Sequence, residues 1–313
     1  MTLSAPRTTP PLPIKFTSGL EIVTAATRPD LWATLNDPAH PLNTAWPEFL
    51  DHDLTFKLFM PIYSRHRALV RFQLLAIEPS ADGNCDTVVG LGRSIPFFWP
   101  EIAHLPSTKR LSDYPDLLST LPDSGYDGTL LRGMASLASQ DDETQPNALS
   151  ALSITIRPDR RRQGLAEALV SAMKDTARAS SLRCLVVPLR PTQKHRFPSV
   201  QMAEYINWTW DDPDPGISPI RPFDPWLRKH LQLGGRIVKI ATSSMIIRGT
   251  CDEWRKWTGV DLTASKDREK SKERYIEVPI PRGLVPVRVD LVDGTGIYTE
   301  PNIWIYHELD DLG

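Results

Sequence analysis

The stretch that decides the fold is residues 152–189, LSITIRPDRRRQGLAEALVSAMKDTARASSLRCLVVPL. It begins with Leu152, Ile154 and Ile156 alternating with polar residues, which predicts a half-buried strand. After a turn, residues repeat at the three- and four-residue spacing of an amphipathic helix: Leu165, Leu169, Ala172, Met173 and Thr176. The continuous apolar run 184–189 is typical of a buried parallel strand. Together these segments predict one right-handed βαβ unit.

The segment 161–166 between this strand and helix has the properties of an anion-binding turn. Gly164 lets the backbone approach a ligand closely, and the N–H groups at the helix N-terminus can bind a diphosphate. Arg160, Arg161 and Arg162 are expected to add positive charge around it. The segment lacks both the Gly-Lys-Ser/Thr of a Walker loop and the three spaced glycines of the dinucleotide fingerprint.

The composition excludes several classes of protein. The 313 residues include 36 Lys and Arg against 38 Asp and Glu, and 41% are hydrophobic, as in an ordinary globular protein. The near-neutral charge argues against nucleic acid as a partner. No apolar run approaches the roughly 18 residues of a membrane helix, and the N-terminus does not resemble a secretory signal. Three distant cysteines without metal-ligand spacing predict no metal and a reduced, cytoplasmic location: Cys85, Cys184 and Cys251.

The N-terminal half is expected to surround the βαβ unit. The proline-rich residues 1–14 predict a flexible leader, followed by a single domain over 15–313. We expect a strand at 21–26, then short helices over 30–66 broken at Pro38, Pro41, Pro47 and Pro61. Residues 67–78 and 86–94 predict an antiparallel hairpin. Residues 95–147 show no such pattern and predict an insertion, either a lid or a surface excursion without a role.

The C-terminal half is expected to continue with helices and strands. We predict helices at 199–209 and 225–233, strands at 236–241 and 245–248, and a solvated charge run at 266–274. Residues 293–296, Asp-Gly-Thr-Gly, lie between alternating segments and predict a hairpin turn. A C-terminal β extension over 250–313 follows from this.

The pattern Arg161-x-x-Gly164-x-Ala166 resembles the acyl-coenzyme A signature of the GNAT superfamily of N-acetyltransferases, Arg/Gln-x-x-Gly-x-Gly/Ala. Its context raises its specificity, because in that family the turn also follows a strand, opens a long helix and leads to a parallel strand. The resemblance covers residues 150–248 well and 20–94 loosely. It implies a mixed α/β fold whose twisted sheet is mainly antiparallel, with one parallel pair at its middle.

The resemblance also implies acetyl-coenzyme A (acetyl-CoA) as cosubstrate. Main-chain groups of Ile154, Thr155 and Ile156 are then expected to pair with the pantetheine amides, as an added strand would. The acetyl carbonyl should lie where the parallel strands part, polarised by a backbone N–H near Ile156. Main-chain N–H groups are expected to hold the pyrophosphate from Arg161, Arg162, Gln163, Gly164, Leu165 and Ala166.

Two residues are candidates for catalysis. Tyr205 falls where the family has the tyrosine that protonates the leaving thiolate, although a core tyrosine with a locally bonded hydroxyl would leave the same pattern. His195 lies just past the second parallel strand with a suitable unperturbed pKa, although a loop histidine is more often solvated. Glu204 and Tyr205 are helix neighbours and cannot both face one pocket, so the general base stays unnamed.

Other residues have weaker functional readings. His230 is expected at a helix C-terminus, where the dipole favours its charged form. The acidic loop residues Asp211, Asp212 and Asp214 could attract a cationic acceptor or simply form a loop. A set of tryptophans predicts core packing in preference to a substrate cage: Trp208, Trp210, Trp226, Trp254 and Trp257.

The resemblance therefore predicts a cytoplasmic enzyme that transfers acetyl directly from acetyl-CoA to a small-molecule amine. Two alternatives stay open. One is O-acylation or transfer of a longer acyl group on the same scaffold, and the other is an acyl-CoA-binding protein without turnover. The sequence leaves the oligomeric state open.

Overall fold

The strands form one mixed sheet. The computed structural model describes residues 14–16, 19–37, 39–80, 85–106, 108–139, 141–210, 221–264 and 274–309. Ten strands run in the order β1-β2-β3-β4-β5-β6-β10-β9-β8, with β7 paired to β10 off this path. Their bounds are β1 Ile14–Lys15, β2 Glu21–Thr24, β3 Leu74–Glu78, β4 Thr87–Phe97, β5 Ala148–Ile156, β6 Cys184–Leu189, β7 Arg236–Thr250, β8 Tyr275–Val278, β9 Val287–Asp290 and β10 Thr295–Glu308. Among these strands only β5 and β6 pair in parallel, which confirms the predicted fold class.

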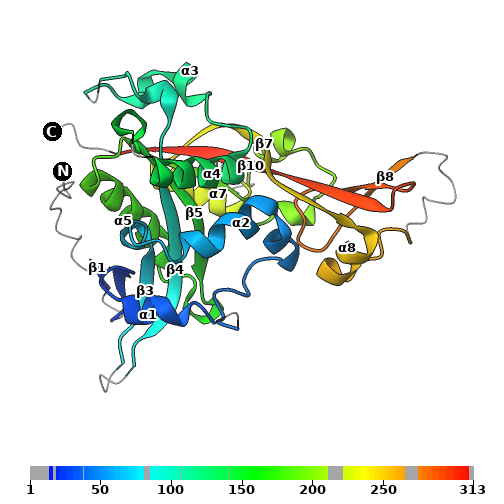
Figure 1. Ribbon diagram of the computed structural model, residues 1–313, viewed down its shortest axis with the longest axis horizontal. Helices are drawn as coiled ribbons and strands as arrows, with labels where there is room; N and C mark the ends of the chain where they lie inside the picture. The colour runs from blue at the N-terminus through cyan, green and yellow to red at the C-terminus, as the bar shows by residue number, and fades with distance from the viewer. Residues whose placement is uncertain are drawn as a thin grey trace.

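Helices cover both faces of this sheet. They are α1 Pro29–Thr34, α2 Leu54–Tyr63, α3 Pro115–Leu118, α4 Gly125–Ala138, α5 Leu165–Ala179, α6 Met202–Tyr205, α7 Pro225–Gln232 and α8 Cys251–Thr258. Short 3-10 turns connect some of them, including η1 Glu48–His52, η2 Val70–Phe72, η6 Pro158–Arg160 and η7 Lys194–Arg196. Figure 1 shows the helices gathered around the main part of the sheet.

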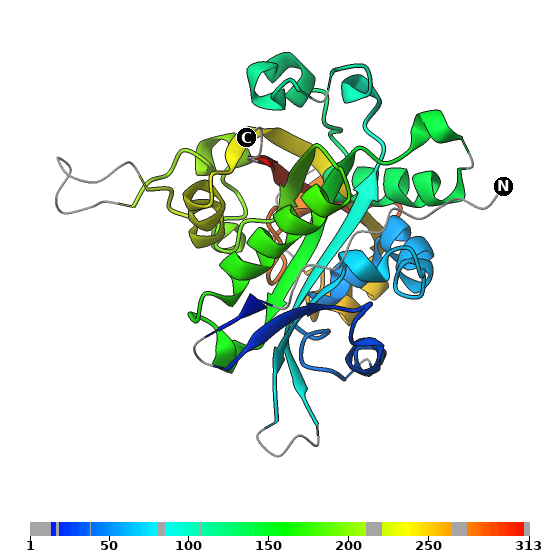
Figure 2. The ribbon, with the colours of Figure 1, turned by 90° about the vertical axis from the view of Figure 1, so that its left-hand side faces the viewer.

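Gly92 of β4 and Gly133 of α4 show which helix lies on which face of the sheet. A Cβ at Gly92 in β4 would meet Met173 and Leu169 of α5, so α5 packs against the face that Gly92 presents. A Cβ at Gly133 in α4 would lie 2.5 Å from the Ile95 side chain, and Ile95 faces the opposite side of the same strand. Figure 2 shows the same division, with α5 on one side of the central strands and α2 with α4 on the other.

The βαβ unit forms where the sequence predicts it. Helix α5 begins at Leu165 and buries the predicted stripe, including Leu169, Ala172 and Met173. Strand β6 has the predicted bounds and is buried along its whole length. Strand β5 is longer than predicted, because it begins at Ala148 and pairs with the end of β4.

Several expectations for the N-terminal half need correction. Ile14 pairs with Ile22 in the sheet, so the predicted leader ends before it, and residues 1–13 lie outside the described residues. Residues 70–72 form a 3-10 turn, stabilised by local bonds such as Phe72 N–H to Leu69 O, and only 74–78 continue as a strand. Pro61 lies inside α2, where it removes one backbone bond near the end of the helix.

Residues 95–147 are part of the fold. Strand β4 continues to Phe97, and α4 packs closely on it through Gly133. The segment also contributes Phe97, Trp99 and Leu121 to a buried cluster against β6 and β10. Its apolar residues therefore help to cover the sheet, and Tyr126 from the same segment lines the cavity described below.

The C-terminal residues extend the sheet into an arm with its own core. We use "C-terminal arm" for β8, β9, α8 and the parts of β7 and β10 that pair with them, on the right of Figure 1. Phe49 and Leu50 of η1 pack into this core beside Trp254 and Tyr298. The predicted hairpin turn is confirmed between β9 and β10, whereas the two strands predicted over 236–248 form one long strand, β7.

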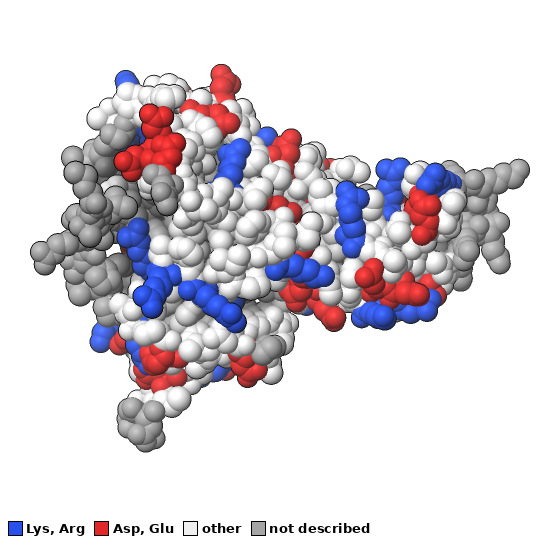
Figure 3. Space-filling model, viewed as in Figure 1, with Lys and Arg blue, Asp and Glu red and all other residues white. Residues whose placement is uncertain are grey.

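The surface carries charges of both signs. On the face seen in Figure 3, acidic and basic side chains are interspersed over the main sheet and the C-terminal arm, as expected for a near-neutral chain. Within the described residues, no helix combines the length and apolar character needed to cross a lipid bilayer. The predicted charge run 266–274 lies outside them, apart from Arg274.

Candidate active site

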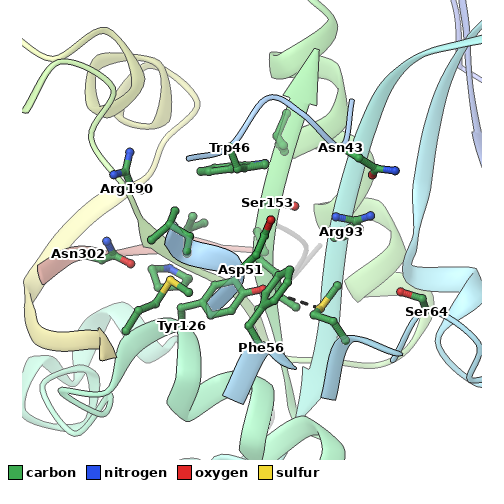
Figure 4. A pocket seen from close by; sticks show the side chains of 18 of the residues that line it. Asn43, Trp46, Asp51, Phe56, Ser64, Arg93, Tyr126, Ser153, Arg190 and Asn302 are labelled. Carbon is green, nitrogen blue, oxygen red and sulfur yellow. Dashed lines mark hydrogen bonds between the residues drawn. The ribbon is translucent and has the colours of Figure 1, made fainter. Parts of the chain in front are cut away.

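A cavity of about 660 Å³ lies where β5 and β6 part. The two strands pair only at Leu149 with Leu185 and at Ser150 with Val186. The residues that follow on both strands, 151–154 and 187–189, line the cavity. Figure 4 shows side chains from β4, β5, η1, α2 and α4 facing this space. The cavity is therefore a consequence of the short parallel pairing in the middle of the sheet.

A β-bulge at Leu152 shapes β5 beside the cavity. Opposite β4, Ser153 pairs with Arg93 and Ala151 pairs with Ser94, so Leu152 is an extra residue. A bulge bends the strand and increases its twist, which helps β5 to leave β6. Beyond Ser150 the β6-facing edge of β5 has no neighbouring strand among the described residues, so its main-chain groups are available to a ligand.

The turn after β5 has the features of an anion site. Gly164 is the N-cap of α5 with φ +79°, and no atom lies within 4 Å of the position that a Cβ would take. No side chain caps this helix, so its first N–H groups point into open space. Arg162 also has a positive φ, 65°, and the exposed Arg161 donates from Nε to Ile156 O. The residues present therefore fit a diphosphate.

One of the three arginines expected around that anion is paired with acidic side chains of the protein. Arg160 forms ion pairs with Glu78 and Asp159, at 2.8 and 2.9 Å. None of the described ion pairs includes Arg161 or Arg162. The positive charge at the turn therefore comes from these two side chains, and Arg160 mainly ties the turn to the end of β3.

Tyr205 is a buried residue outside the cavity lining. Its ring packs among Phe197, Trp208 and Phe223, and its hydroxyl donates to Asp224 at 2.9 Å. Asp224 also caps α7 by accepting from the Trp226 and Leu227 N–H groups. Burial raises the pKa of Tyr205 far above its usual value, with the Asp224 charge adding to the effect. The acid role stays a prediction, and in this arrangement it requires the bond to Asp224 to break.

We expect Tyr205→Phe to destabilise the protein through loss of the bond to Asp224. The hydroxyl donates to a buried carboxylate, so its loss should reduce the free energy of unfolding by about 1.5 kcal/mol. Urea unfolding and steady-state kinetics check this together. A fall in kcat of about 10²–10⁴-fold with little loss of stability would instead identify Tyr205 as the general acid.

The two candidate histidines lie in different surroundings, with His230 in the last turn of α7 as predicted. His195 lies in η7, half-buried near Arg190, Arg196 and Arg282, and it does not line the cavity. His230 lines the cavity, is fully buried in α7 and lies 2.9 Å from His307 between Nδ1 and Nε2. Burial lowers the pKa of His230 to about 3, so it is a neutral residue and not the dipole-stabilised cation expected from the sequence.

The other expected residues are divided between core and surface. Trp254 is fully buried in the core of the C-terminal arm, and Trp208 packs in the Tyr205 cluster, as the core reading predicts. Trp226 lines the cavity, whereas Trp210 is exposed. Asp211, Asp212 and Asp214 lie outside the described residues. Within the described residues, no cluster of three His, Cys, Asp or Glu side chains could hold a metal ion.

The sequence did not predict the wall of the cavity on the side of the sheet away from α5. The Trp46 indole donates to the Thr155 hydroxyl at 3.1 Å and so fixes the segment before η1 against β5. Tyr126 of α4 contacts Met60 of α2 through its hydroxyl, and Phe56 lies beside them (Figure 4). The only indication of this wall in the sequence is Trp46, a large residue in a proline-rich loop.

A buried polar network forms the end of the cavity near β10. Glu300 is fully buried and accepts from Arg190 at 2.9 Å, from the Tyr298 hydroxyl at 2.6 Å and from Asn302 at 3.2 Å. Asn302 in turn accepts from Ser244. These bonds join Arg190, Tyr298 and Asn302 to one carboxylate and hold Arg190 at the position where the chain leaves β6.

Acidic groups gather where α2 and α4 begin. Burial raises the pKa of Asp51, an effect that Glu48 adds to and Arg93 opposes. Burial and the neighbouring Asp53 raise the pKa of Asp127 to about 9, so this carboxyl is protonated at neutral pH. Of these groups Asp51 lines the cavity and is exposed to it.

Two comparisons identify the family. The acetyltransferase (GNAT) family matches residues 92–205. The arginine N-acetyltransferase avaD of Aspergillus versicolor is 35% identical over 303 residues, which span 95% of this chain and 97% of that protein. This chain belongs to the GNAT family. As a GNAT enzyme it is an N-acetyltransferase, which confirms the expectation from its sequence.

Solved GNAT structures resemble this GNAT chain more distantly. The loading GNATL domain of CurA from Lyngbya majuscula has a TM-score of 0.46 and 15% identity, covering 93% of this chain and 98% of that domain. The arylalkylamine N-acetyltransferase 7 of the mosquito Aedes aegypti has a TM-score of 0.37 and 10% identity, covering 96% of this chain and 93% of that protein.

Proposed function

We propose that this protein uses acetyl-CoA to acetylate a nitrogen of arginine or of a closely related small guanidino amine. The observation that carries the proposal is the 35% identity to an arginine N-acetyltransferase over nearly the full length of both chains. The match spans 95% of this chain and 97% of that protein. A small-molecule amine is the acceptor class that the sequence predicts, and a cavity of about 660 Å³ is of the size that holds such a ligand.

Acetyl-CoA supplies a thioester whose acetyl group can be transferred to an amine without a covalent enzyme intermediate. The chain offers the unpaired edge of β5 at Ile154, Thr155 and Ile156 for the pantetheine amides. The N–H groups from Arg161 to Ala166, around Gly164, suit the pyrophosphate. These assignments follow the signature residue by residue and stay proposals.

The expected position of the acetyl carbonyl changes with the structure. The strands part directly after Ser150 and Val186, whereas Ile156 lies at the far end of β5. A carbonyl at the point of divergence would therefore meet main-chain groups near the bulge at Leu152 and not near Ile156. Fixed N–H groups at that place would stabilise the oxyanion as the amine attacks.

The cavity also offers a group for a cationic acceptor. Asp51 lines the side that α2, α4 and Trp46 enclose, and its carboxylate attracts a guanidinium or ammonium group. When the nitrogen attacks, an N–C bond forms, the C–S bond breaks, and the proton lost by nitrogen balances the one that the coenzyme thiolate takes up. The protein residue that carries this proton is left unassigned.

An amine panel tests the proposed function. Purified protein is incubated with acetyl-CoA and arginine, agmatine, lysine, spermidine or tryptamine, with thiol release followed and the product identified by mass spectrometry. We expect kcat/KM for arginine to exceed that for lysine and tryptamine by at least about tenfold, the discrimination of one well-placed polar contact. Faster turnover of tryptamine than of arginine contradicts the proposal.

Two further arms address the alternatives. Butyryl-CoA and an alcohol acceptor test for longer acyl groups and for O-acylation. Calorimetric binding of acetyl-CoA without turnover of any amine in the panel would favour a binding protein that lacks catalysis.

A further inference from the structure

Arg93 is a cationic side chain of the cavity that has no ion-pair partner in the described part of the chain. It lies in the middle of β4, is half-buried and lines the cavity. Its Nε atom is buried and has no hydrogen-bond partner, and none of the ion pairs among the described residues includes it. A guanidinium held in this way is unfavourable unless a ligand supplies an acceptor oxygen.

The strand geometry places Arg93 on the acceptor side of the sheet. Gly92 faces α5, so the next residue, Arg93, faces the opposite side, toward α2 and α4. Figure 4 shows it facing the same space as Asp51 and Ser153. Helix α5 and the anion turn belong to the coenzyme side, so Arg93 is not positioned to serve the diphosphate.

The distance along the strand also separates Arg93 from the position proposed for the diphosphate. Arg93 pairs with Ser153, which is three residues before the end of β5 at Ile156. Three residues of strand span roughly 10 Å, and the diphosphate turn begins only beyond that point. The diphosphate is therefore not the anion that Arg93 would meet.

Arg190 lines the same cavity, but its guanidinium is bonded to other groups of the protein. Its Nε donates to both oxygens of Glu300, at 2.9 and 3.1 Å, and Nη2 donates to Arg282 O at 2.7 Å. Its charge is balanced by a buried carboxylate within the protein. Arg93 forms no ion pair among the described residues, and its charge acts on Asp51, which also lines the cavity.

We propose that Arg93 binds the carboxylate of the acceptor, so that the substrate is an amino acid with a free carboxyl group. Asp51 then faces the cationic end of the same molecule. The inference rests on the proposed function and narrows it: it separates arginine from agmatine, which has the guanidinium but no carboxylate. Arg93 would act as a specificity-determining residue, because it binds a group other than the acetylated nitrogen.

The test compares three acceptors with the same guanidinium: L-arginine, L-argininamide and agmatine. We expect the wild-type kcat/KM to be about 100-fold higher for arginine than for the amide, the effect of one charged hydrogen-bonding pair. In Arg93→Met the value for arginine should fall about 100-fold, while the amide changes less than about threefold. Arg93→Lys should recover part of the preference. The change should be in the KM for arginine, with the KM for acetyl-CoA unaffected.

Controls keep the result interpretable. Arg71→Met removes an exposed arginine outside the cavity and should behave as wild type. Calorimetric titration with arginine and with acetyl-CoA reports binding independently of turnover and verifies that each variant is folded.

The outcomes separate this inference from the proposed function. Equal use of arginine and argininamide by the wild-type enzyme overturns the role of Arg93 and leaves arginine acetylation intact. An equal loss for both acceptors in Arg93→Met, or a raised KM for acetyl-CoA, also overturns it. An absence of both binding and turnover with arginine overturns the proposed function and this inference with it.

Discussion

Replacing Gly164 by glutamate is expected to weaken acetyl-CoA binding by at least about 100-fold. Gly164 has φ +79° at the N-terminus of α5, where free N–H groups face open space. A glutamate brings negative charge to the position proposed for the pyrophosphate and prefers a different backbone conformation. Both effects act on the ligand site and not on packing, because no atom lies within 4 Å of the new Cβ.

Thermal or urea unfolding with and without acetyl-CoA measures this effect. At about 100 times the dissociation constant, the ligand should stabilise the wild-type protein by about 2.7 kcal/mol, and a variant weakened 100-fold by about 0.4 kcal/mol. Stabilisation of the variant equal to that of the wild type would remove Gly164 from the coenzyme site.

Gly259→Glu is the matched control. Gly259 also has a positive φ, +74°, with no atom within 4 Å of a Cβ, but it ends α8 in the C-terminal arm. The same backbone strain of about 1–2 kcal/mol is expected, with full stabilisation by acetyl-CoA. The comparison therefore separates strain from ligand binding.

Truncating Glu300 to alanine is expected to lower the free energy of unfolding by about 3–5 kcal/mol. The carboxylate is fully buried and balances Arg190, whose side chain is itself largely buried. Without Glu300, a guanidinium and the Tyr298 hydroxyl are left in the interior without their acceptor. Urea unfolding followed by circular dichroism measures the loss.

Two variants test the cause of that loss. Glu277→Ala removes an exposed glutamate from β8 and should change stability by less than about 0.5 kcal/mol. The double variant Arg190→Met with Glu300→Leu removes both charges and should recover much of the stability. If the double variant is as unstable as Glu300→Ala, the unpaired arginine is not the reason.

The βαβ unit could be predicted because its information is local. Alternation over 152–156, the helical spacing after Gly164 and the apolar run 184–189 each indicate one element without reference to distant residues. The resemblance to the family signature at Arg161, Gly164 and Ala166 then predicted the sheet around this unit. The residues proposed for the coenzyme come from the same local stretch, and their role stays a prediction.

The part of the cavity away from the βαβ unit could not be predicted in this way. Trp46, Arg93 and Glu300 come from three distant parts of the chain, and only the pairing of β4, β5, β6 and β10 brings them together. Arg93 looks like any polar residue in an alternating strand, and its lack of a partner is visible only once every neighbour is in place. Tyr205 lies in a helix that the sequence predicts, but its hydroxyl bonds to Asp224. No spacing in the sequence indicated that this aspartate would be its neighbour.

The place of β10 in the sheet has a consequence for synthesis on the ribosome. Strand β10 lies between β6 and the strands β7 and β9, all of which precede it in the chain. Until it emerges, β6 has an open edge and the fully buried Trp304 and Tyr306 are missing from their cluster. The cavity therefore acquires its Glu300 and Asn302 end only at that late step, so nascent chains that stop before β10 lack both a closed sheet and that end of the cavity.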